Sequence, residues 1–432
     1  MGLNVARYSK SEAWLQCAEQ TIPLGSQTFS KSRTQYPVGI SPLFAMKAKG
    51  AKIQDVDGNW YVDLVNSLAA ITIGYGDKQI SKAVTKQLSK GVIYSLPGTL
   101  EAEVASLLVE LVPSAELVRF GKNGTDATSA AVRLARAYTG RDLIAVCGYH
   151  GWQDWYIGST TRDKGVPAST KSLTKSFKFN EIASLSELIS EFPQQLAAVI
   201  MEPMNVSFPR ENFLQDVRKL CDENGIVLIF DETITGFRFS SGGAQELFAV
   251  TPDLSTFGKG LANGFPLSAV VGKRQIMKEM EEIFFSGTFG GELLSLAAAK
   301  VVLEKHKKVN IASALAQKGE NLRNEVQKLI EENNLEKMLT LSGHPTWVFL
   351  NWAPTDKYSV DELKTFFMQE MFQRGVLILN AHNVSLAFGR KELRIVLKAY
   401  SETLHSLSEA ISSQTLREKL LVEPLTPLFK VR

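Results

Sequence analysis

The sequence predicts an α/β protein: a large domain on a mostly parallel sheet flanked by helices, followed by a smaller α+β C-terminal domain. Three observations predict this fold. Between about residues 77 and 305, stretches with helical periodicity alternate with short apolar runs, which is typical of successive strand and helix units. From about residue 311 this alternation stops. The chain has 432 residues, more than one hydrophobic core usually holds, so we expect more than one domain.

Apolar residues that recur every three or four positions mark the first helices of the large domain. One helix covers residues 80–88 and a second covers residues 104–112. A third covers residues 126–138, has small and apolar side chains on one face, and begins directly after Gly124 and Thr125. We expect all three helices to pack on the sheet.

A helix followed at once by a buried strand predicts the centre of the large domain. The helix carries apolar residues from 214 to 221 and ends at Asn224-Gly225, which is a common C-terminal signal. The apolar run of residues 226–230 then predicts a strand that is buried on both faces. Asp231 follows the carboxyl end of this strand, where open α/β sheets bind their ligands.

The C-terminal part has its own pattern of strands and helices. Residues 346–352 predict a strand, and Ser359 with Glu362 forms a capping box at the start of the next helix. A short strand over residues 376–379 follows. We therefore expect three parts: an N-terminal arm or segment, a large cofactor-binding domain and a small C-terminal domain, over residues 1–60, 61–310 and 311–432.

The composition favours a protein that acts on small molecules. Hydrophobic residues make up 44% and charged residues 22%, as in ordinary globular proteins, and the formal net charge is only +3. No block of lysine and arginine interleaved with aromatic residues predicts a nucleic-acid or membrane partner. The three cysteines, Cys17, Cys147 and Cys221, are far apart and lack metal-binding spacing, so we expect reduced thiols and a cytoplasmic location.

Three predicted strand ends carry groups that suit one another chemically. Gly124 and Thr125 open a helix, where unpaired backbone N–H groups favour a phosphate, although such a pair alone is more often only a cap. Asp231 could hold a proton on a pyridinium ring or be an ordinary turn cap. Lys259 lies between two glycines in STFGKGLANGFPLSAVVG, and a desolvated amine there would attack an aldehyde. Together these groups predict pyridoxal phosphate (PLP) as the cofactor.

The order and context of these residues resemble the class III aminotransferases of fold type I, and most closely the glutamate-1-semialdehyde 2,1-aminomutase group. The resemblance covers most of the chain, through the segments GAKIQDVDGNWYVDL, VPSAELVRFGKNGTDATSAAVRLARAYTGRD, GYHGWQD, IMEP, DETITGFR, FGKGLANGFPLSAVVG and GTFGGELLSLAAA. It implies that Lys259 forms the internal aldimine with PLP and that Asp231 pairs with the pyridine nitrogen. Gly124 and Thr125 would bind the phosphate.

The resemblance implies four further contacts to the cofactor. Tyr149 matches the aromatic residue that stacks on the ring, and Glu202 and Thr233 match positions near the ring. The family usually has valine where this chain has Thr233. Thr288 resembles the threonine that reaches the phosphate across a dimer interface, which implies a homodimer with shared active sites.

Three departures from the family pattern fall on substrate positions. Leu68 in NSLAAITIGY replaces the tryptophan of a motif like SWGPLILGH. The arm motif resembling GGVNSPVR reads LGSQTFSKSR here, and offers Lys31 or Arg33 in place of its arginine. The Ser-x-x-Glu element near the C-terminus is replaced by ILNAHNVSLAF, around His382. These changes argue against carboxylate recognition of the family kind.

The sequence therefore predicts a PLP-dependent aminotransferase that moves an amino group from a small-molecule donor to a small carbonyl acceptor by a ping-pong mechanism. The alternative within the same family is glutamate-1-semialdehyde 2,1-aminomutase. An alternative of another class is a non-catalytic PLP-fold binding protein.

Overall fold

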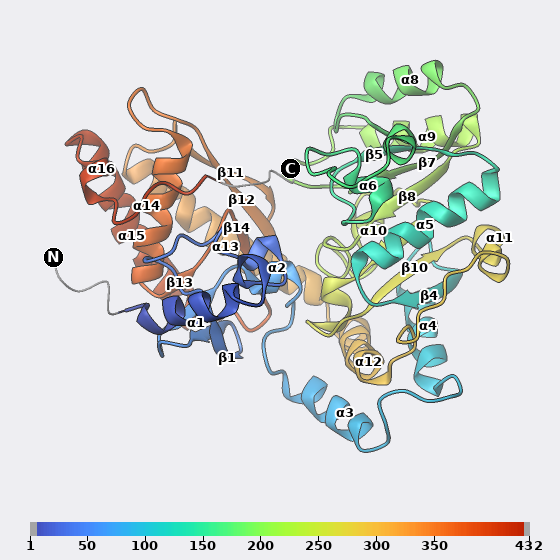
Figure 1. The fold of residues 1–432 in the computed structure, drawn as a ribbon, viewed down its shortest axis with the longest axis horizontal. Helices are drawn as coiled ribbons and strands as arrows, with labels where there is room; N and C mark the ends of the chain where they lie inside the picture. Colours follow the sequence, from blue (N-terminus) through green and yellow to red (C-terminus); the bar gives the residue numbers. More distant parts are fainter. Residues whose placement is uncertain (1–6, 427–432) are drawn as a thin grey trace. The chain divides into compact units, whose positions relative to one another are not determined.

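The computed structural model describes residues 7–426, which form two compact units. One unit contains residues 78–313 together with the short segment 70–72. The other contains, among the described residues, 7–69, the segment 73–77 and 314–426. Figure 1 shows the elements of each unit. Residues 7–60 thus share a compact unit with the C-terminal part, and the predicted three-part division stays a prediction.

The unit that contains residues 78–313 is built on a seven-stranded sheet in the order β4-β10-β9-β8-β7-β5-β6. Neighbouring strands run parallel from β9 to β6, whereas β10 is antiparallel to both β4 and β9. The predicted mostly parallel sheet is therefore confirmed. The strands are β4 Leu117–Gly121, β5 Leu143–Cys147, β6 Thr174–Ser176, β7 Leu196–Met201, β8 Val227–Asp231, β9 Leu254–Phe257 and β10 Ser268–Gly272.

Helices cover both faces of this sheet because its central strands bury side chains on both sides. Ile200 and Ile229 share a core with α5 (Gly124–Thr139), whereas Val199 and Leu228 share one with α9 (Phe213–Asn224). The predicted helices over 80–88 and 104–112 are α3 Lys78–Leu88 and α4 Thr99–Leu111. The other α-helices of this unit are α6 Asp154–Ile157, α7 Ala168–Ser172, α8 Ile182–Glu191, α10 Ala244–Leu247, α11 Arg274–Met277 and α12 Leu293–Lys308.

The other unit holds two smaller sheets, in the orders β1-β2-β3-β13 and β11-β12-β14. The first is joined by a parallel pairing between β3 and β13, which ties the N-terminal residues to the C-terminal part of the chain. The strands of the first sheet are β1 Ala45–Lys49, β2 Lys52–Asp55, β3 Trp60–Asp63 and β13 Val376–Leu377. Those of the second sheet are β11 Leu339–His344, β12 Trp347–Trp352 and β14 Ala381–Asn383. The long helices of this unit are α1 Ser9–Glu19, α14 Val360–Gln373 and α15 Arg390–Ser412, and α13 Ile311–Glu332 begins just before it.

The capping box predicted for α14 is present. The Ser359 hydroxyl accepts from the Glu362 amide at 3.3 Å, and the Glu362 carboxylate accepts from the Ser359 amide at 2.8 Å. Arg417 also donates to this carboxylate, and that hydrogen bond, together with those from Ser359, lowers the pKa of Glu362 to about 2 despite its burial. The cap therefore depends on an ionised carboxylate.

Glu362→Gln is expected to make the free energy of unfolding decrease less when the pH is lowered. The folded pKa lies below the value of 4.5 for a free glutamate, so the stabilisation is present above about pH 4.5 and is lost as pH falls towards 2. Because the Arg417 side chain is 65% exposed, we expect an effect of only about 1 kcal/mol. Urea unfolding at pH 7 and pH 3 measures the difference. The control Glu325→Gln changes an exposed partner of Lys328 and should leave the pH dependence as it is.

Among residues 7–426, no helix has both the length and the apolar character needed to cross a lipid bilayer.

Candidate active site

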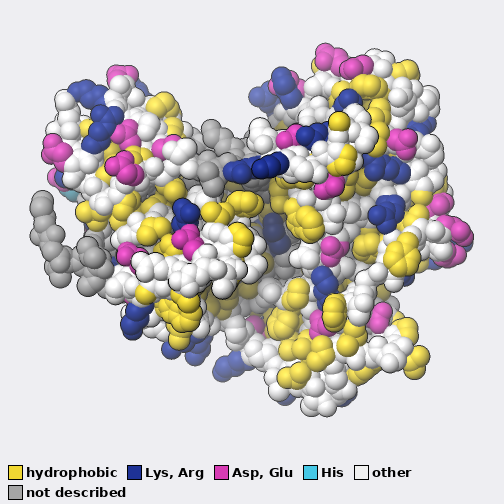
Figure 2. All heavy atoms as spheres, viewed as in Figure 1, with side chains coloured by type: hydrophobic (Ala, Val, Ile, Leu, Met, Phe, Trp, Pro, Cys, Tyr) yellow, Lys and Arg dark blue, Asp and Glu magenta, His cyan; other side chains and the backbone are white. Residues whose placement is uncertain are grey.

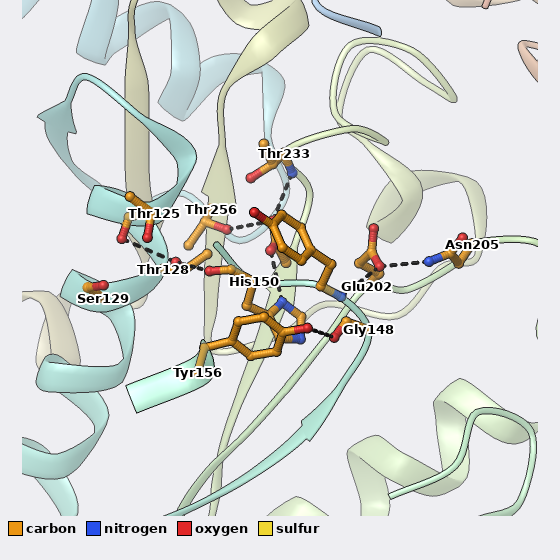
Figure 3. Close-up of polar contacts among 12 residues, drawn as sticks. Thr125, Thr128, Ser129, Gly148, His150, Tyr156, Glu202, Asn205, Thr233 and Thr256 are labelled. Carbon is orange, nitrogen blue, oxygen red and sulfur yellow. Dashed lines mark hydrogen bonds and ion pairs between the residues drawn. The ribbon is translucent and has the colours of Figure 1, made fainter. Parts of the chain in front are cut away.

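The candidate site is centred on Asp231, the last residue of β8. Its side chain is 4% exposed, and both of its oxygens accept hydrogen bonds. Oδ1 accepts from the Thr233 amide and from the Thr256 hydroxyl, each at 3.1 Å, and Oδ2 lies 2.9 Å from Nδ1 of His150 (Figure 3). Burial raises the pKa of Asp231, but the interactions with His150, with smaller ones from Thr233, outweigh it, and the pKa lies below its usual value. Asp231 is therefore an ionised carboxylate held in one direction.

His150 is a site residue that the sequence analysis did not identify. It follows Tyr149 in the loop after β5, so it lies at the same edge of the sheet as Asp231. Its imidazole is fully buried against the rings of Trp155 and Tyr156. The available signal was its position just beyond the carboxyl end of a predicted strand, but a single histidine there is more often an ordinary core residue.

Tyr149 is held by the carboxylate of Glu202, which follows β7. The backbone amide of Tyr149 donates to Oε2 of Glu202 at 3.1 Å, and the Asn205 side chain donates to the same oxygen at 2.7 Å (Figure 3). Gly148 permits this approach, because a Cβ there would lie 2.6 Å from Oε2, and its φ is +107°. The ring of Tyr149 meets that of Tyr156 edge-on at 5.6 Å. Glu202 thus fixes the loop that carries Tyr149.

The first turn of α5 contains Gly124 and Thr125, where the sequence predicts an anion-binding site. Asp126 accepts from the Asn123 amide at 2.8 Å, which closes the start of the helix. Thr125 is 5% exposed, and its hydroxyl accepts from the Trp152 amide at 3.3 Å. The N–H groups of a first helical turn have no acceptor within the helix, so they are available to an anion.

Thr233 connects this turn to Asp231 and to the segment of Lys259. Its Cγ2 lies so close to Gly124 and Gly258 that a Cβ added to either would be 3.0 Å or 3.3 Å away. A side chain at either position would be tightly packed against Thr233, and glycine avoids this crowding. Lys259 follows Gly258 directly, is half-buried, and begins a short 3-10 helix with φ at +40°.

Thr288 lies apart from this cluster. It is exposed in the loop before α12 and lines a cavity of about 390 Å³. The start of α5 contributes Asp126 and Ser129 to the same cavity. Within one chain, a series of neighbouring contacts thus links seven of the eight predicted residues. Thr288 is the exception, and it lines a cavity together with residues of α5.

The residues that the resemblance places at substrate positions lie in the other unit. His382 is fully buried on β14, its Nε2 lies 2.6 Å from the Tyr400 hydroxyl, and burial lowers its pKa to about 3. Arg33 is paired with Glu19 near the surface. Leu68 belongs to a left-handed turn, and Lys31 is exposed. His382 is therefore a packed core residue.

The residues of the cluster fit the PLP that the sequence predicts. PLP needs an anion site for its phosphate, a carboxylate for its pyridine nitrogen, an aromatic face and a lysine amine. The chain offers the start of α5, Asp231, Tyr149 and Lys259. The glycines at positions 124 and 258 leave out the Cβ atoms that would crowd this region.

Comparisons with known proteins agree with this chemistry. Residues 35–411 match the family model described as aminotransferase class-III. The chain is 31% identical over 415 residues to a 3-aminobutyryl-CoA aminotransferase of Cloacimonas acidaminovorans, covering 94% of this chain and 99% of that protein. It is 34% identical over 428 residues to a glutamate-1-semialdehyde 2,1-aminomutase of Desulforapulum autotrophicum, covering 92% and 99%.

A solved structure supports the fold. The FumI protein of Sphingopyxis sp. MTA144, in its PLP internal aldimine form, matches with a TM-score of 0.87 and 27% identity, over 94% of this chain and 98% of that one. A family model that spans most of the chain, and two relatives above 30% identity matched over nearly their whole length, show that this chain belongs to the class III aminotransferases, PLP-dependent enzymes of fold type I.

Proposed function

We propose that Lys259, Asp231 and the first turn of α5 form the catalytic centre of this aminotransferase, which moves an amino group from an amino donor to a small carbonyl acceptor. One observation carries the proposal. Thr233 donates its amide to Asp231 and packs its Cγ2 against Gly124 and Gly258, so three functional elements meet at one residue. An acidic group, an anion site and a lysine are thereby held within one part of the unit.

The protein's residues have separate tasks in this centre. When bound, PLP supplies an electron sink for the negative charge that develops at the substrate Cα. Asp231 would hold the proton at the pyridine nitrogen, and the N–H groups of Gly124 and Thr125 would bind the phosphate. Tyr149, whose backbone is held by Glu202, would supply an aromatic face for the ring.

Lys259 has two roles in the proposal. Its amine would hold the cofactor covalently before the substrate amine enters. Once released, the neutral amine would take the proton from the substrate Cα as a general base and then deliver it to the cofactor as a general acid. A lysine can do both because its ammonium group gives up a proton when it is desolvated, which arginine does not do.

We propose transamination rather than internal amino transfer as the reaction. A mutase has to keep its intermediate bound through both half-reactions, whereas a transaminase releases one product and admits a second substrate. Three features support the view that this chain would hold a small charged intermediate only weakly. Leu68 stands in place of an aromatic residue, Arg33 is already paired with Glu19, and His382 is packed against Tyr400. The aminomutase stays the alternative because that relative is 34% identical.

The half-reaction with a single amino donor tests the function. Mixed with glutamate and no acceptor, the holoenzyme is expected to pass from the PLP to the pyridoxamine form, which absorbance follows directly. A second substrate, added after the donor is removed, should restore the PLP form. Efficient conversion of glutamate 1-semialdehyde to 5-aminolevulinate, with no external donor or acceptor, would replace this proposal with the aminomutase.

A homodimer with shared sites is part of the proposal. Thr288 would contact the phosphate bound by the partner subunit, since it is exposed and lies on the same loop as Phe284 and Phe289, which are 79% and 59% exposed. Figure 2 shows further apolar side chains on the surface of this unit. Tyr94 and Leu96, in the segment after α3, are also exposed, at 46% and 77%. Contiguous exposed apolar surface is typical of protein interfaces.

The three free cysteines support a cytoplasmic location.

Gly151→Ala is expected to weaken PLP binding at least tenfold. A Cβ at Gly151 would lie 2.4 Å from the Thr125 hydroxyl, so it would displace the first turn of α5 and its phosphate-binding N–H groups. Titration of the apoenzyme with PLP, followed by absorbance, measures the affinity.

Gly165→Ala is the matched control. Gly151 and Gly165 both have positive φ, at +106° and +92°, but a Cβ at Gly165 meets nothing within 4 Å. Both variants therefore carry similar backbone strain, and only Gly151→Ala changes the proposed phosphate site. Equal PLP affinity in the two variants would argue against phosphate binding at Thr125.

A further inference from the structure

We propose that Lys122 and Glu292 form a positioning ion pair, which holds the loop of residues 284–291 so that its Thr288 can reach the phosphate bound by the partner subunit. Lys122 of one subunit would thus support the cofactor site of the other. This consequence rests on the proposed function, in which a homodimer shares Thr288, but the ion pair itself does not. Its Nζ–Oε2 distance is 3.0 Å, and the two side chains are only 19% and 12% exposed.

The loop needs anchors because its own backbone is permissive. Three of its eight residues are glycine, which has more backbone freedom than any other residue. Thr288 lies in a turn that the Gly290 amide closes by donating to the Gly287 carbonyl at 3.0 Å. A second turn follows, in which the Glu292 amide donates to the Phe289 carbonyl at 3.1 Å. Two successive turns thus connect Thr288 to Glu292, so an anchor at Glu292 restricts where Thr288 can lie.

Glu292 is itself held at the start of α12. Its Oε1 accepts from the Leu294 amide at 2.7 Å, and its Oε2 accepts from the amide and the hydroxyl of Ser295 at 3.2 Å and 2.6 Å. Lys122 donates to the same Oε2. Burial raises the pKa of Glu292, but the hydrogen bonds from Ser295 and Lys122 outweigh it, and the pKa lies below its usual value. Glu292 is therefore an ionised carboxylate, and its bond to the lysine ammonium is charge-assisted.

The other member of the pair, Lys122, comes from the turn that begins α5. Its backbone amide donates to Oδ2 of Asp126 at 2.9 Å, and the Asn123 amide donates to the same oxygen at 2.8 Å. Gly124 and Thr125, the proposed phosphate-binding residues, follow directly in the chain. The ion pair therefore ties the loop to a fixed point of the phosphate-binding turn.

Two arginines hold the other end of the loop to the same segment of the chain. Arg119 on β4 donates to the Phe285 carbonyl at 3.2 Å, and Arg133 on α5 donates to the Phe284 carbonyl at 2.6 Å. Both contacts are exposed, where water competes for each group, whereas the ion pair is largely shielded. Between these ends Thr288 lines the cavity of about 390 Å³ beside α5. We therefore expect the ion pair to be the stronger anchor of the loop.

The effect on the loop can be measured in the full-length protein without any assumption about catalysis. Amide hydrogen exchange, followed by mass spectrometry on peptides that cover the loop, reports on the amides of Gly290 and Glu292. Lys122→Met has nearly the same length but no charge, and should raise their exchange rate by about tenfold. Lys122→Arg keeps the charge and should exchange like the wild type. An unchanged rate in Lys122→Met would overturn the proposal.

Lys307→Met is the matched control. Lys307 lies at the far end of α12, and its Nζ is 2.7 Å from Oε2 of Glu110. This variant also removes the lysine from an ion pair that involves α12, but at the end away from the loop. Exchange in the loop should match that of the wild type. An equal increase in Lys307→Met and Lys122→Met would overturn the proposal, because a general loosening of α12 would explain both.

Mixed dimers test the role in the partner's site. Two different tags isolate dimers in which one subunit carries Lys259→Ala, so that only the other subunit can bind PLP covalently. Titration with PLP, followed by borohydride reduction and mass spectrometry, measures the affinity of that intact site. Lys122→Met placed in the Lys259→Ala subunit should weaken PLP binding by about tenfold, as should Thr288→Ala placed there. Lys122→Arg in the same subunit should leave the affinity at the wild-type value.

Each outcome decides either the ion pair or the shared site. If Thr288→Ala acts across the dimer and Lys122→Met does not, or acts only within the subunit that binds PLP, the shared site stands and the ion-pair proposal is overturned. If neither acts across the dimer, or if the wild type forms no dimer, the shared site fails, and the role of the pair in the partner's site fails with it. If no reduced adduct forms on Lys259, the proposed catalytic centre fails, while hydrogen exchange still decides whether the pair holds the loop.

Discussion

Lys259→Arg is expected to abolish the donor half-reaction, with a loss on the order of 10⁴-fold or more. Arginine keeps the positive charge and most of the length of the side chain, but its guanidinium stays protonated. It therefore can neither bind the cofactor covalently nor carry the proton between Cα and C4′. Single-turnover absorbance with glutamate measures the rate, and mass spectrometry after borohydride reduction shows whether PLP is attached, and to which residue.

Lys273→Arg is the matched control for this change. Lys273 belongs to the same unit, follows β10, and its Nζ lies 2.6 Å from Oδ1 of Asp253. Arginine can maintain that ion pair, so activity should stay close to the wild-type value. A Lys259→Arg variant that reacts within tenfold of wild type, or a reduced adduct that maps to another lysine, would show that Lys259 is not the catalytic amine.

Features of the fold that depend on local sequence were predictable. The helix after Thr125 has small side chains on one face, and the residues there are buried against the sheet. The capping box of Ser359 and Glu362 involves residues three apart, so its hydrogen bonds need no distant partner. The strand predicted at residues 226–230 is Val227–Asp231, which places Asp231 within the strand rather than after it.

Features that depend on distant pairing left no such signal. The parallel pairing of Val376 with Val62 joins β3 to β13, more than 300 residues further along the chain, and the local pattern of either strand does not specify the other. The turn over Asn66–Ala69 is similar, since four successive residues that are not glycine have φ from +46° to +67°. Asp63 supports the start of this turn by accepting from the amides of Val65 and Asn66, and the Tyr75 hydroxyl donates to the same carboxylate. Tertiary contacts here override local preference.

The residues of the candidate site also fall into those that the local sequence predicts and those that depend on distant parts of the chain. Its glycines, Asp231 and Lys259 were predicted because each stands at a strand end in a recognisable motif. His150 was missed because its role depends on Asp231 and on the rings around it, and these come from segments that are far apart in the sequence. The position of Thr233 between Gly124 and Gly258 likewise follows from packing.

Asp231→Asn is expected to leave PLP bound but to slow the donor half-reaction by about 10²- to 10³-fold, or roughly 3–4 kcal/mol of activation free energy. An asparagine has almost the same shape, but its neutral amide cannot balance a positive charge on the pyridine nitrogen. Its NH₂ group would also meet donors, because the partners of Asp231 are the Thr233 amide, the Thr256 hydroxyl and His150. The start of α5 and Lys259 are unchanged, so the cofactor should remain attached.

The experiment therefore separates binding from chemistry. PLP content by mass spectrometry should match that of the wild type, while stopped-flow absorbance with saturating glutamate shows the slower reaction. Thr256→Val is the matched control, since it removes one hydrogen bond at 3.1 Å from Oδ1 yet leaves the carboxylate, and should cost less than tenfold. If Asp231→Asn reacts at nearly the wild-type rate, Asp231 only stabilises the end of β8. If the Asp231→Asn variant cannot bind PLP at all, the carboxylate is needed to hold the cofactor. The proposal that Asp231 serves the chemistry while the phosphate site serves binding would then be wrong.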